Sequence, residues 1–187
     1  MSVSPITFQA AWSTQTTGAV LTVPIPAGAQ AGDAILLVIT PSFRPSGIPD
    51  GWTTLNLYVL SYVHVVTAAE AANPATTWSF TWKGSVYISA AYVSYRGCLD
   101  LRPVHYTNYY TIDSSQTNHV CPALSAVYAN PPLEPRTKVI RIWEGRLSAY
   151  SKGYSFTAPA GTTTRVNLAP EANHPALLIV DEDADAC

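Results

Sequence analysis

The side chains best suited to catalysis or metal binding are four histidines and a scattered set of acids. The histidines are His64, His105, His119 and His174. They lie far apart in the sequence, and none has the short spacing to a second ligand that is typical of zinc sites. The chain contains neither Gly-x-Ser-x-Gly nor His-Glu-x-x-His, the patterns of a serine nucleophile and of a zinc protease. We therefore expect no catalytic residue, no metal ligand and no cofactor, and a protein that is not an enzyme.

Paired carboxylates, as glycoside cleavage requires, are the remaining catalytic alternative. The candidates are Asp33, Asp50, Glu70, Asp100 and Glu144. Most of them fall where the sequence predicts a turn. Glu70 follows Thr67 by three residues, which is the spacing of a capping box at a helix N-terminus. We interpret Glu70 as a helix cap and Asp33 and Asp50 as turn residues, although a catalytic pair stays open.

The stretch "IPAGAQAGDAILLVIT" places Gly28 and Gly32 before Asp33 and an apolar run. A phosphate-binding P-loop needs a lysine and a hydroxyl residue directly after its second glycine, because these reach the phosphates and magnesium. Here an aspartate follows, and its charge would repel phosphate. Gly-Asp is common turn chemistry, and a six-residue run rich in Ile, Leu and Val is typical of a buried strand. We predict a turn that leads into a strand, with a positive φ at Gly32 and backbone bonds to Asp33.

Tyr106, Tyr109 and Tyr110 lie close to His105 and Asn108 in a segment rich in aromatic residues and proline. Exposed tyrosines can stack on sugar rings or fill the core of a protein interface. The three tyrosines are therefore our candidate protein or glycan interface. The alternative is that two of the three belong to the core side of a strand.

The C-terminal "DEDAD" places Asp181, Asp183 and Asp185 at alternate positions, as at the start of a calcium loop. The glycine and the final bidentate glutamate of such a loop are missing. We expect residues 181–187 to form a solvated acidic tail at the periphery, which could dock on a basic surface of a partner.

Composition limits the class of protein. Apolar residues make up 48% of the 187 residues and charged residues only 12%, about half the usual share. A surface so poor in charge either faces other protein or is rich in Ser, Thr and Asn. The net charge of −2 gives no basic field for nucleic acid. We therefore expect no nucleic acid as a partner. The N-terminus does not resemble a signal peptide, and no run is long enough to span a membrane, so we expect no membrane partner either.

The cysteines are Cys98, Cys121 and Cys187, an odd number without a Cys-x-x-Cys pair. This argues against a disulfide scaffold and against a zinc site. Cys98 and Cys121 could pair in the fold, but we expect free, buried thiols in a protein made in a reducing cell.

Short strand-like segments, separated by glycine and proline, run through most of the chain. In "TTWSFTW", Trp78, Phe80 and Trp82 alternate with Thr and Ser, as in a strand with one buried face. The only helical signal is "TAAEAANP", which Pro74 limits to a turn or two. We predict an all-β fold: a single antiparallel β-sandwich, jelly-roll-like, over residues 1–180 with at most one short helical turn.

The order of several turn motifs resembles a β-sandwich family found in tailed-phage virion proteins. The landmarks are Pro26, Gly28, Gly32 and Asp33, then Pro49, Gly51, Trp52 and Thr53, then Thr67, Ala68 and Glu70, then Tyr95, Arg96 and Gly97. The resemblance covers roughly residues 5–170. The segment 105–135 is richer in aromatics and prolines than that family, and the acidic end is not part of it. Both departures suggest features specific to this protein's partner.

The resemblance implies a non-enzymatic structural protein of a phage particle. Within that class we favour a capsid decoration (cement) protein, because the chain has no stalk or attachment module beside its one compact body. Its partners would be the major capsid protein and its own copies, as a homotrimer, on the outer surface of the capsid after synthesis in the host cytoplasm. The alternative is a tail fibre or tail-tip head that recognises host glycan. A secreted carbohydrate-binding module or glycosidase is a third hypothesis, which the missing signal peptide disfavours.

Overall fold

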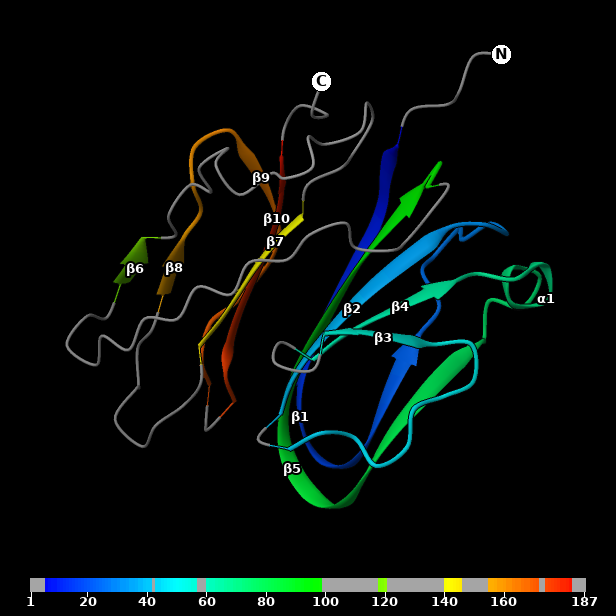
Figure 1. Cartoon of the computed structure of the whole chain (residues 1–187), viewed down its shortest axis with the longest axis horizontal. Coiled ribbons are helices and arrows are strands. Elements are labelled where there is room, and N and C mark those ends of the chain that lie inside the picture. Colours follow the sequence, from blue (N-terminus) through cyan, green and yellow to red (C-terminus); the bar gives the residue numbers. More distant parts are fainter. Residues whose placement is uncertain are drawn as a thin grey trace. The chain divides into compact units, whose positions relative to one another are not determined.

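The computed structural model describes residues 6–41, 43–56, 60–98, 118–120, 140–145, 155–171 and 174–182. The elements of its first half are β1 (Thr7–Pro24), β2 (Ala34–Pro41), β3 (Thr53–Asn56), β4 (Ser61–Val65), α1 (Ala68–Ala71) and β5 (Thr77–Arg96). Those of the second are β6 (Asn118–Val120), β7 (Ile140–Gly145), β8 (Ser155–Thr157), β9 (Thr162–Leu168) and β10 (Ala176–Glu182). Strands make up 66% and helix only 3% of the structure, which confirms the all-β prediction (Figure 1).

Contacts divide the chain into two compact units, Met1–Leu101 and Arg102–Cys187. The extent of a single domain over residues 1–180 stays a prediction. Unit 1 holds one antiparallel sheet in the order β1-β5-β2-β4-β3. The predicted strand "TTWSFTW" is the first part of β5, which pairs along its length with β1.

The long β1–β5 ribbon bends, and this bend builds the core of unit 1. The register shifts between Gly18 and Val20. Both strands curve strongly in Figure 1. Beyond the bend, Phe80 lies in the same hydrophobic cluster as side chains from the β2–β4 part of the sheet. The centroid of the Phe80 ring is 5.1 Å from that of Tyr62 on β4. The ribbon therefore covers a face of its own sheet, and unit 1 has two layers of strand around one core.

The alternation predicted for the first part of β5 is confirmed, and β1 shows the same pattern. In β5, Trp78, Phe80 and Trp82 are buried, whereas Thr77 and Ser79 are exposed. In β1, Leu21 and Val23 are buried while Val20 and Thr22 are exposed. One face of each strand thus enters the core, as a period of two residues requires.

Two predicted turn features also hold. Gly32 has a φ of 89°, which a residue without a side chain adopts at low cost. Thr67 is the N-cap of α1, and both hydrogen bonds of a capping box with Glu70 are present. These local features place Asp33 at the start of β2 and Glu70 beside the end of β4.

Unit 2 contains a three-stranded antiparallel sheet, β7-β10-β9, and the parallel pair β6–β8. β10 is the central strand of the larger sheet. Its side chains Leu178 and Val180 pack with Trp143, Phe156 and Ala158.

The prediction of an acidic tail beginning at Asp181 is wrong for its first two residues. Asp181 and Glu182 belong to β10, and Asp181 is fully buried. Neighbouring strands pair with β10 on both sides here, and arginines neutralise the acids. Arg165 Nε donates to Asp181 Oδ2 at 2.9 Å, and Arg141 pairs with Glu182. Residues 183–187 lie outside the described part of the chain.

Candidate functional site

The interface candidates Tyr106, Tyr109 and Tyr110 lie outside the described residues, so their role stays a prediction. The described residues contain three features that are relevant to function. Two are polar clusters at turns of unit 1, and the third is a group of exposed apolar side chains at its bend.

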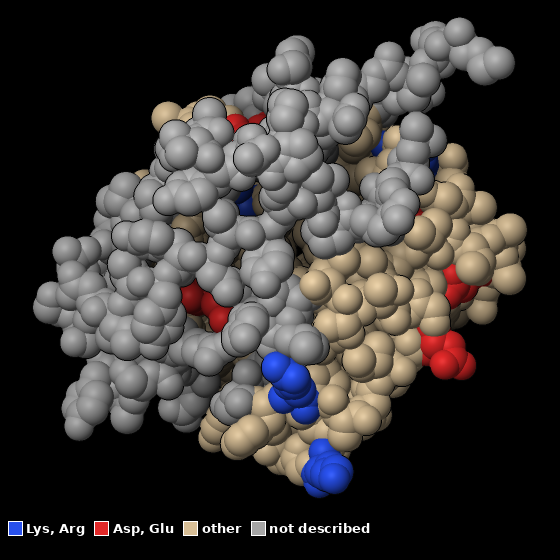
Figure 2. Space-filling view, in the orientation of Figure 1, with Lys and Arg blue, Asp and Glu red and all other residues tan. Residues whose placement is uncertain are grey.

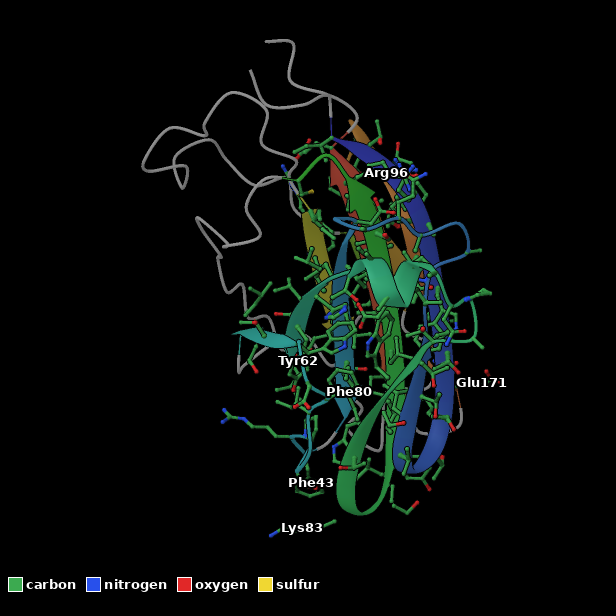
Figure 3. All side chains as sticks on the ribbon, turned by 90° about the vertical axis from the view of Figure 1, so that its right-hand side faces the viewer. Phe43, Tyr62, Phe80, Lys83, Arg96 and Glu171 are labelled. Atoms are coloured by element: carbon green, nitrogen blue, oxygen red, sulfur yellow. The ribbon has the colours of Figure 1, made fainter. Side chains whose placement is uncertain are left out.

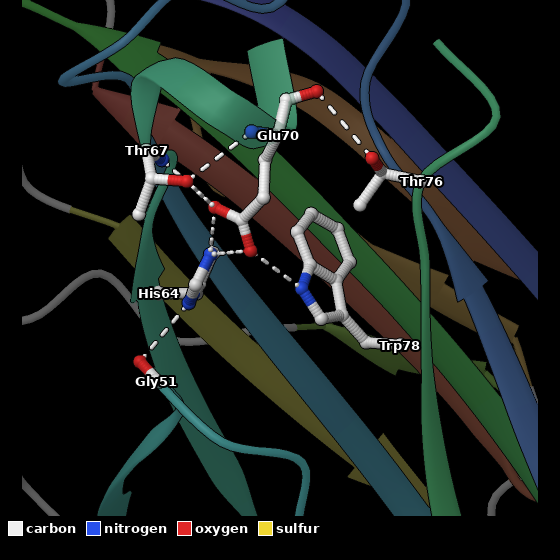
Figure 4. A network of polar contacts seen from close by, with 6 residues as sticks. All are labelled: Gly51, His64, Thr67, Glu70, Thr76 and Trp78. Carbon is white, nitrogen blue, oxygen red and sulfur yellow. Dashed lines mark hydrogen bonds and ion pairs between the residues drawn. The ribbon is translucent and has the colours of Figure 1, made fainter. Parts of the chain in front are cut away.

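The first cluster is built around His64, which β4 places in the interior of unit 1. His64 is only 3% exposed, and each of its ring nitrogens faces an oxygen atom (Figure 4). Nδ1 lies 3.0 Å from the carbonyl oxygen of Gly51. Nε2 lies 2.9 Å from Glu70 Oε2 and 3.0 Å from Oε1. His64 therefore connects the turn before β3 to helix α1.

Glu70 receives several further hydrogen bonds. The Thr67 backbone N–H and the Thr67 hydroxyl donate to Oε2, each at 2.8 Å, and Trp78 Nε1 donates to Oε1 at 3.0 Å (Figure 4). Burial by itself would raise the pKa of Glu70. The hydrogen bonds from Thr67, His64 and Trp78 outweigh burial and lower the pKa to about 2. Glu70 is therefore an ionised carboxylate across the neutral range, and its role extends beyond the predicted helix cap.

Aromatic rings enclose the same histidine. Trp52 stacks on His64 with ring centroids 5.1 Å apart and an angle of 21° between the planes. Trp78 approaches with its centroid at 4.9 Å and an angle of 60°. We call Gly51, His64, Glu70 and the two tryptophans the His64 cluster. Since both ring nitrogens already have partners and the ring is buried, the cluster joins elements together and does not present a base to solvent.

The second cluster joins the glycine turn to the end of β5. Arg96 Nε donates to Asp33 Oδ1 at 2.7 Å, and Nη2 donates to Oδ2 at 2.8 Å. The N–H of Gln30 donates to Oδ2, also at 2.8 Å. Burial alone would raise the pKa of Asp33, but the bonds from Arg96 and Gln30 and the charge of Arg96 hold it below its usual value. The Asp33 carboxylate thus closes the turn, which confirms the interpretation as a turn into a strand.

The third feature is a group of exposed apolar side chains at the bend, which we call the end patch: Val20, Phe43 and Ile48. The segments that carry them adjoin the same part of β5 through their backbones. Val20 pairs with Thr81, Gly47 beside Ile48 also pairs with Thr81, and Trp82 Nε1 donates to the carbonyl of Phe43 at 2.8 Å. Phe43 is 71% exposed, and it lies with Lys83 at the opposite end of unit 1 from Arg96 (Figure 3).

The remaining sequence candidates are dispersed. Glu144 lies in β7, His119 in β6, and His174 faces Glu171 in an isolated bridge, whereas Asp50 is in an exposed turn. Asp100, His105, Cys121 and Cys187 lie outside the described residues. Cys98 is a free thiol of intermediate exposure. Within the described ranges, no three His, Cys, Asp or Glu side chains are grouped so that they could hold a metal ion.

Sequence reasoning identified Thr67, Glu70, Gly32 and Asp33 as turn chemistry but missed the partners His64 and Arg96. The available signal was the position of both residues at the ends of strand-like segments. His64 lies near the end of the "SYVHVV" segment, and Arg96 directly follows "AAYVSY". Only the folded structure shows that His64 meets Glu70 and that Arg96 meets Asp33.

Among the described residues, no helix is sufficiently long and apolar to cross a membrane. No protein-family model, curated protein or solved structure matches the chain.

Proposed function

We propose that this chain is a non-enzymatic structural protein of a phage virion, and most specifically a capsid decoration protein that bridges major capsid protein subunits. The observation that supports this proposal best is the end patch. Three exposed apolar side chains belong to segments that adjoin one short part of β5, in a unit that already has its own core. Clustered apolar residues on a folded surface are typical of sites that contact other proteins.

The low charge of the surface supports the same proposal. The described surface in Figure 2 is mostly uncharged, and the whole chain has only 10 basic and 12 acidic residues. Charged residues are depleted in the cores of protein interfaces, because burying an unpaired charge is costly. A decoration protein must contact capsid subunits and neighbouring copies of itself, and such a surface suits both contacts.

The resemblance to phage virion proteins provides further support, since its landmarks have structural roles in unit 1. Gly32 and Asp33 meet Arg96, and Gly51 and Glu70 meet at His64. Contacts of this kind stabilise a fold and do not identify its function. The receptor-binding alternative, a tail fibre or tail-tip head that recognises host glycan, therefore remains the second proposal. It rests on Tyr106, Tyr109 and Tyr110 as residues that stack on sugar.

Two variants test the proposal in particles. In the first, Phe43 and Ile48 are both replaced by serine, and in the second all three tyrosines are replaced by serine. We expect lower occupancy of the protein on particles and earlier release of the genome on heating or chelation. Copy number per particle is the complementary measurement, because a capsid role requires hundreds of copies. Normal occupancy and particle stability together with loss of adsorption to host cells would favour the receptor-binding alternative.

A further inference from the structure

Two exposed cations accompany the end patch. Arg44 directly follows Phe43 in the chain, and Lys83 directly follows Trp82, whose indole donates to the carbonyl oxygen of Phe43 at 2.8 Å. Both cationic side chains are exposed. Phe43 and Lys83 lie at the same end of unit 1 (Figure 3). This end of the unit therefore combines exposed apolar side chains with positive charge.

The charges of unit 1 are unevenly distributed. Its basic residues are Arg44, Lys83 and Arg96, and its acidic residues are Asp33, Asp50, Glu70 and Asp100. Arg96 forms an ion pair with Asp33 at the opposite end of the unit from Phe43 (Figure 3). Asp50 belongs to the Gly51 turn beside the His64 cluster. In the segments that carry or adjoin the end patch, residues 18–22, 43–48 and 80–84, the only charged side chains are those of Arg44 and Lys83.

Backbone contacts hold the segment 43–48 against β5. The N–H of Ser46 donates to the carbonyl oxygen of Thr81 at 2.7 Å, and the N–H of Thr81 donates to the carbonyl oxygen of Gly47 at 3.0 Å. A Cβ on Gly47 would collide with Oγ1 of Thr81, so the two segments approach more closely than a larger residue would allow. A surface that is ordered before binding loses less conformational entropy when it binds. The end patch is thus preorganised.

The chemistry of this surface defines the partner that it fits. An exposed aromatic ring beside other apolar side chains suits an apolar socket, where buried aromatic residues contribute much of the binding energy. Cations at the edge of such a contact attract a partner with negative charge and repel one with positive charge. Arginine also pairs well with carboxylates, because its planar group can donate two parallel hydrogen bonds.

We propose that the end patch binds an apolar socket on a capsid subunit that is rimmed by Asp and Glu side chains. Phe43 fills the socket, and Arg44 and Lys83 meet the acidic rim. This inference rests on the proposed function and adds the chemistry of the partner surface to it.

Titration of the purified full chain onto phage particles that lack it tests the proposal. Wild type should bind less tightly as the ionic strength rises from about 0.1 M to about 1 M, because the Debye length falls from about 10 Å to about 3 Å. The double variant Arg44→Gln with Lys83→Gln should bind about tenfold more weakly at the lower ionic strength, mainly through slower association, and should lose most of the salt dependence. Phe43→Ser should weaken binding at both ionic strengths.

The control variant combines Ala69→Glu with Asn73→Asp, which changes the net charge by the same amount at exposed positions in and after α1. The new carboxylate at position 73 can still accept the bond that the Asn73 side chain accepts from the Ala75 N–H at 3.1 Å. The control should bind as wild type does. Denaturation midpoints of all variants identify any loss of folding.

The possible failures are distinguishable. Equal affinity and equal salt dependence of wild type and the Arg44→Gln, Lys83→Gln variant would overturn the acidic rim and leave the decoration function standing. Equal weakening in the control variant would also overturn it, because overall charge would then be the cause. If wild type does not bind these particles at all, both the proposed function and this inference fail. Binding of wild type to host cells instead, lost in the Arg44→Gln, Lys83→Gln variant, would assign the patch to an anionic surface glycan and overturn the capsid partner.

Discussion

The Asp33 carboxylate and the Arg96 guanidinium form a two-point ion pair that joins the turn before β2 to the last residue of β5. The two bonds measure 2.7 and 2.8 Å. Asp33 is only 1% exposed, whereas Arg96 is 35% exposed. The pair therefore consists of a buried anion and a cation that partly covers it from solvent, 63 residues later in the chain.

This asymmetry predicts unequal effects of the two single substitutions. Arg96→Gln leaves a buried carboxylate without its cation, and we expect a clear fall in the denaturation midpoint. Asp33→Asn leaves only an exposed cation, which water can solvate, so the fall should be smaller. Chemical denaturation of both variants and of the double variant checks this order. The double variant should be less destabilised than the sum of the singles, and strict additivity would contradict a direct coupling.

Glycine substitutions should separate backbone strain from side-chain collision. Gly32 has a φ of 89° and open space where a Cβ would stand, so Gly32→Val should cost about 1–3 kcal/mol from strain alone. Gly51 has a φ of 81°, and a Cβ there would lie 3.0 Å from His64 Cε1. Gly51→Ala should therefore cost more than Gly32→Ala.

Gly84 is the matched control for both positions. It also has open space around a Cβ, but its φ lies outside the left-handed region. Gly84→Ala should change the free energy of unfolding by less than about 0.5 kcal/mol. If Gly32→Ala and Gly84→Ala had equal effects, backbone strain at the glycine turn would not be the cause.

The lowered pKa of Glu70 predicts that the folded protein loses stability in acid. Its pKa is lowered from 4.5 to about 2 in the folded protein, so folding favours the ionised form. This contribution is fully present above pH 4.5 and is lost as the pH falls toward 2, and it amounts to about 3 kcal/mol at most. Denaturation curves between these pH values should show a smaller decline for Glu70→Gln than for wild type. Parallel declines would contradict a dominant role for Glu70, although Asp33 also contributes in the same direction.

Local patterns were sufficient to predict the features that depend on neighbouring residues. The alternation of Trp78, Phe80 and Trp82 identified the core face of β5, and Thr67 with Glu70 identified the start of α1. The sequence did not predict that β5 continues through Gly84 as one strand, because pairing with β1 supports it there. Asp181 was misassigned to a tail because a short acidic run is typical of a solvated terminus. Only the pairing of β9 with β10 shows that Arg165 lies beside Asp181.

The candidate site depended still more on tertiary structure. Glu70 was identified as a cap from a spacing of three residues, whereas its bond to His64 crosses from α1 to β4. His64 meets oxygen atoms from two separate parts of the chain, the Gly51 turn and α1. A pattern of single residues contains no information on such a convergence, because the register of β4 decides which of its side chains point inward.

Two phenylalanines offer a final prediction that separates stability from assembly. Phe80 is fully buried, and its ring lies 5.1 Å from that of Tyr62 and 5.4 Å from that of Trp52, so Phe80→Ala should destabilise unit 1 by about 3–5 kcal/mol. Phe43 is 71% exposed, and Phe43→Ala should change the free energy of unfolding by less than about 0.5 kcal/mol. If the end patch binds capsid subunits, Phe43→Ala should nevertheless lower occupancy on particles at equal expression. A stable Phe43→Ala protein that decorates particles at normal occupancy would remove the end patch from the proposed interface.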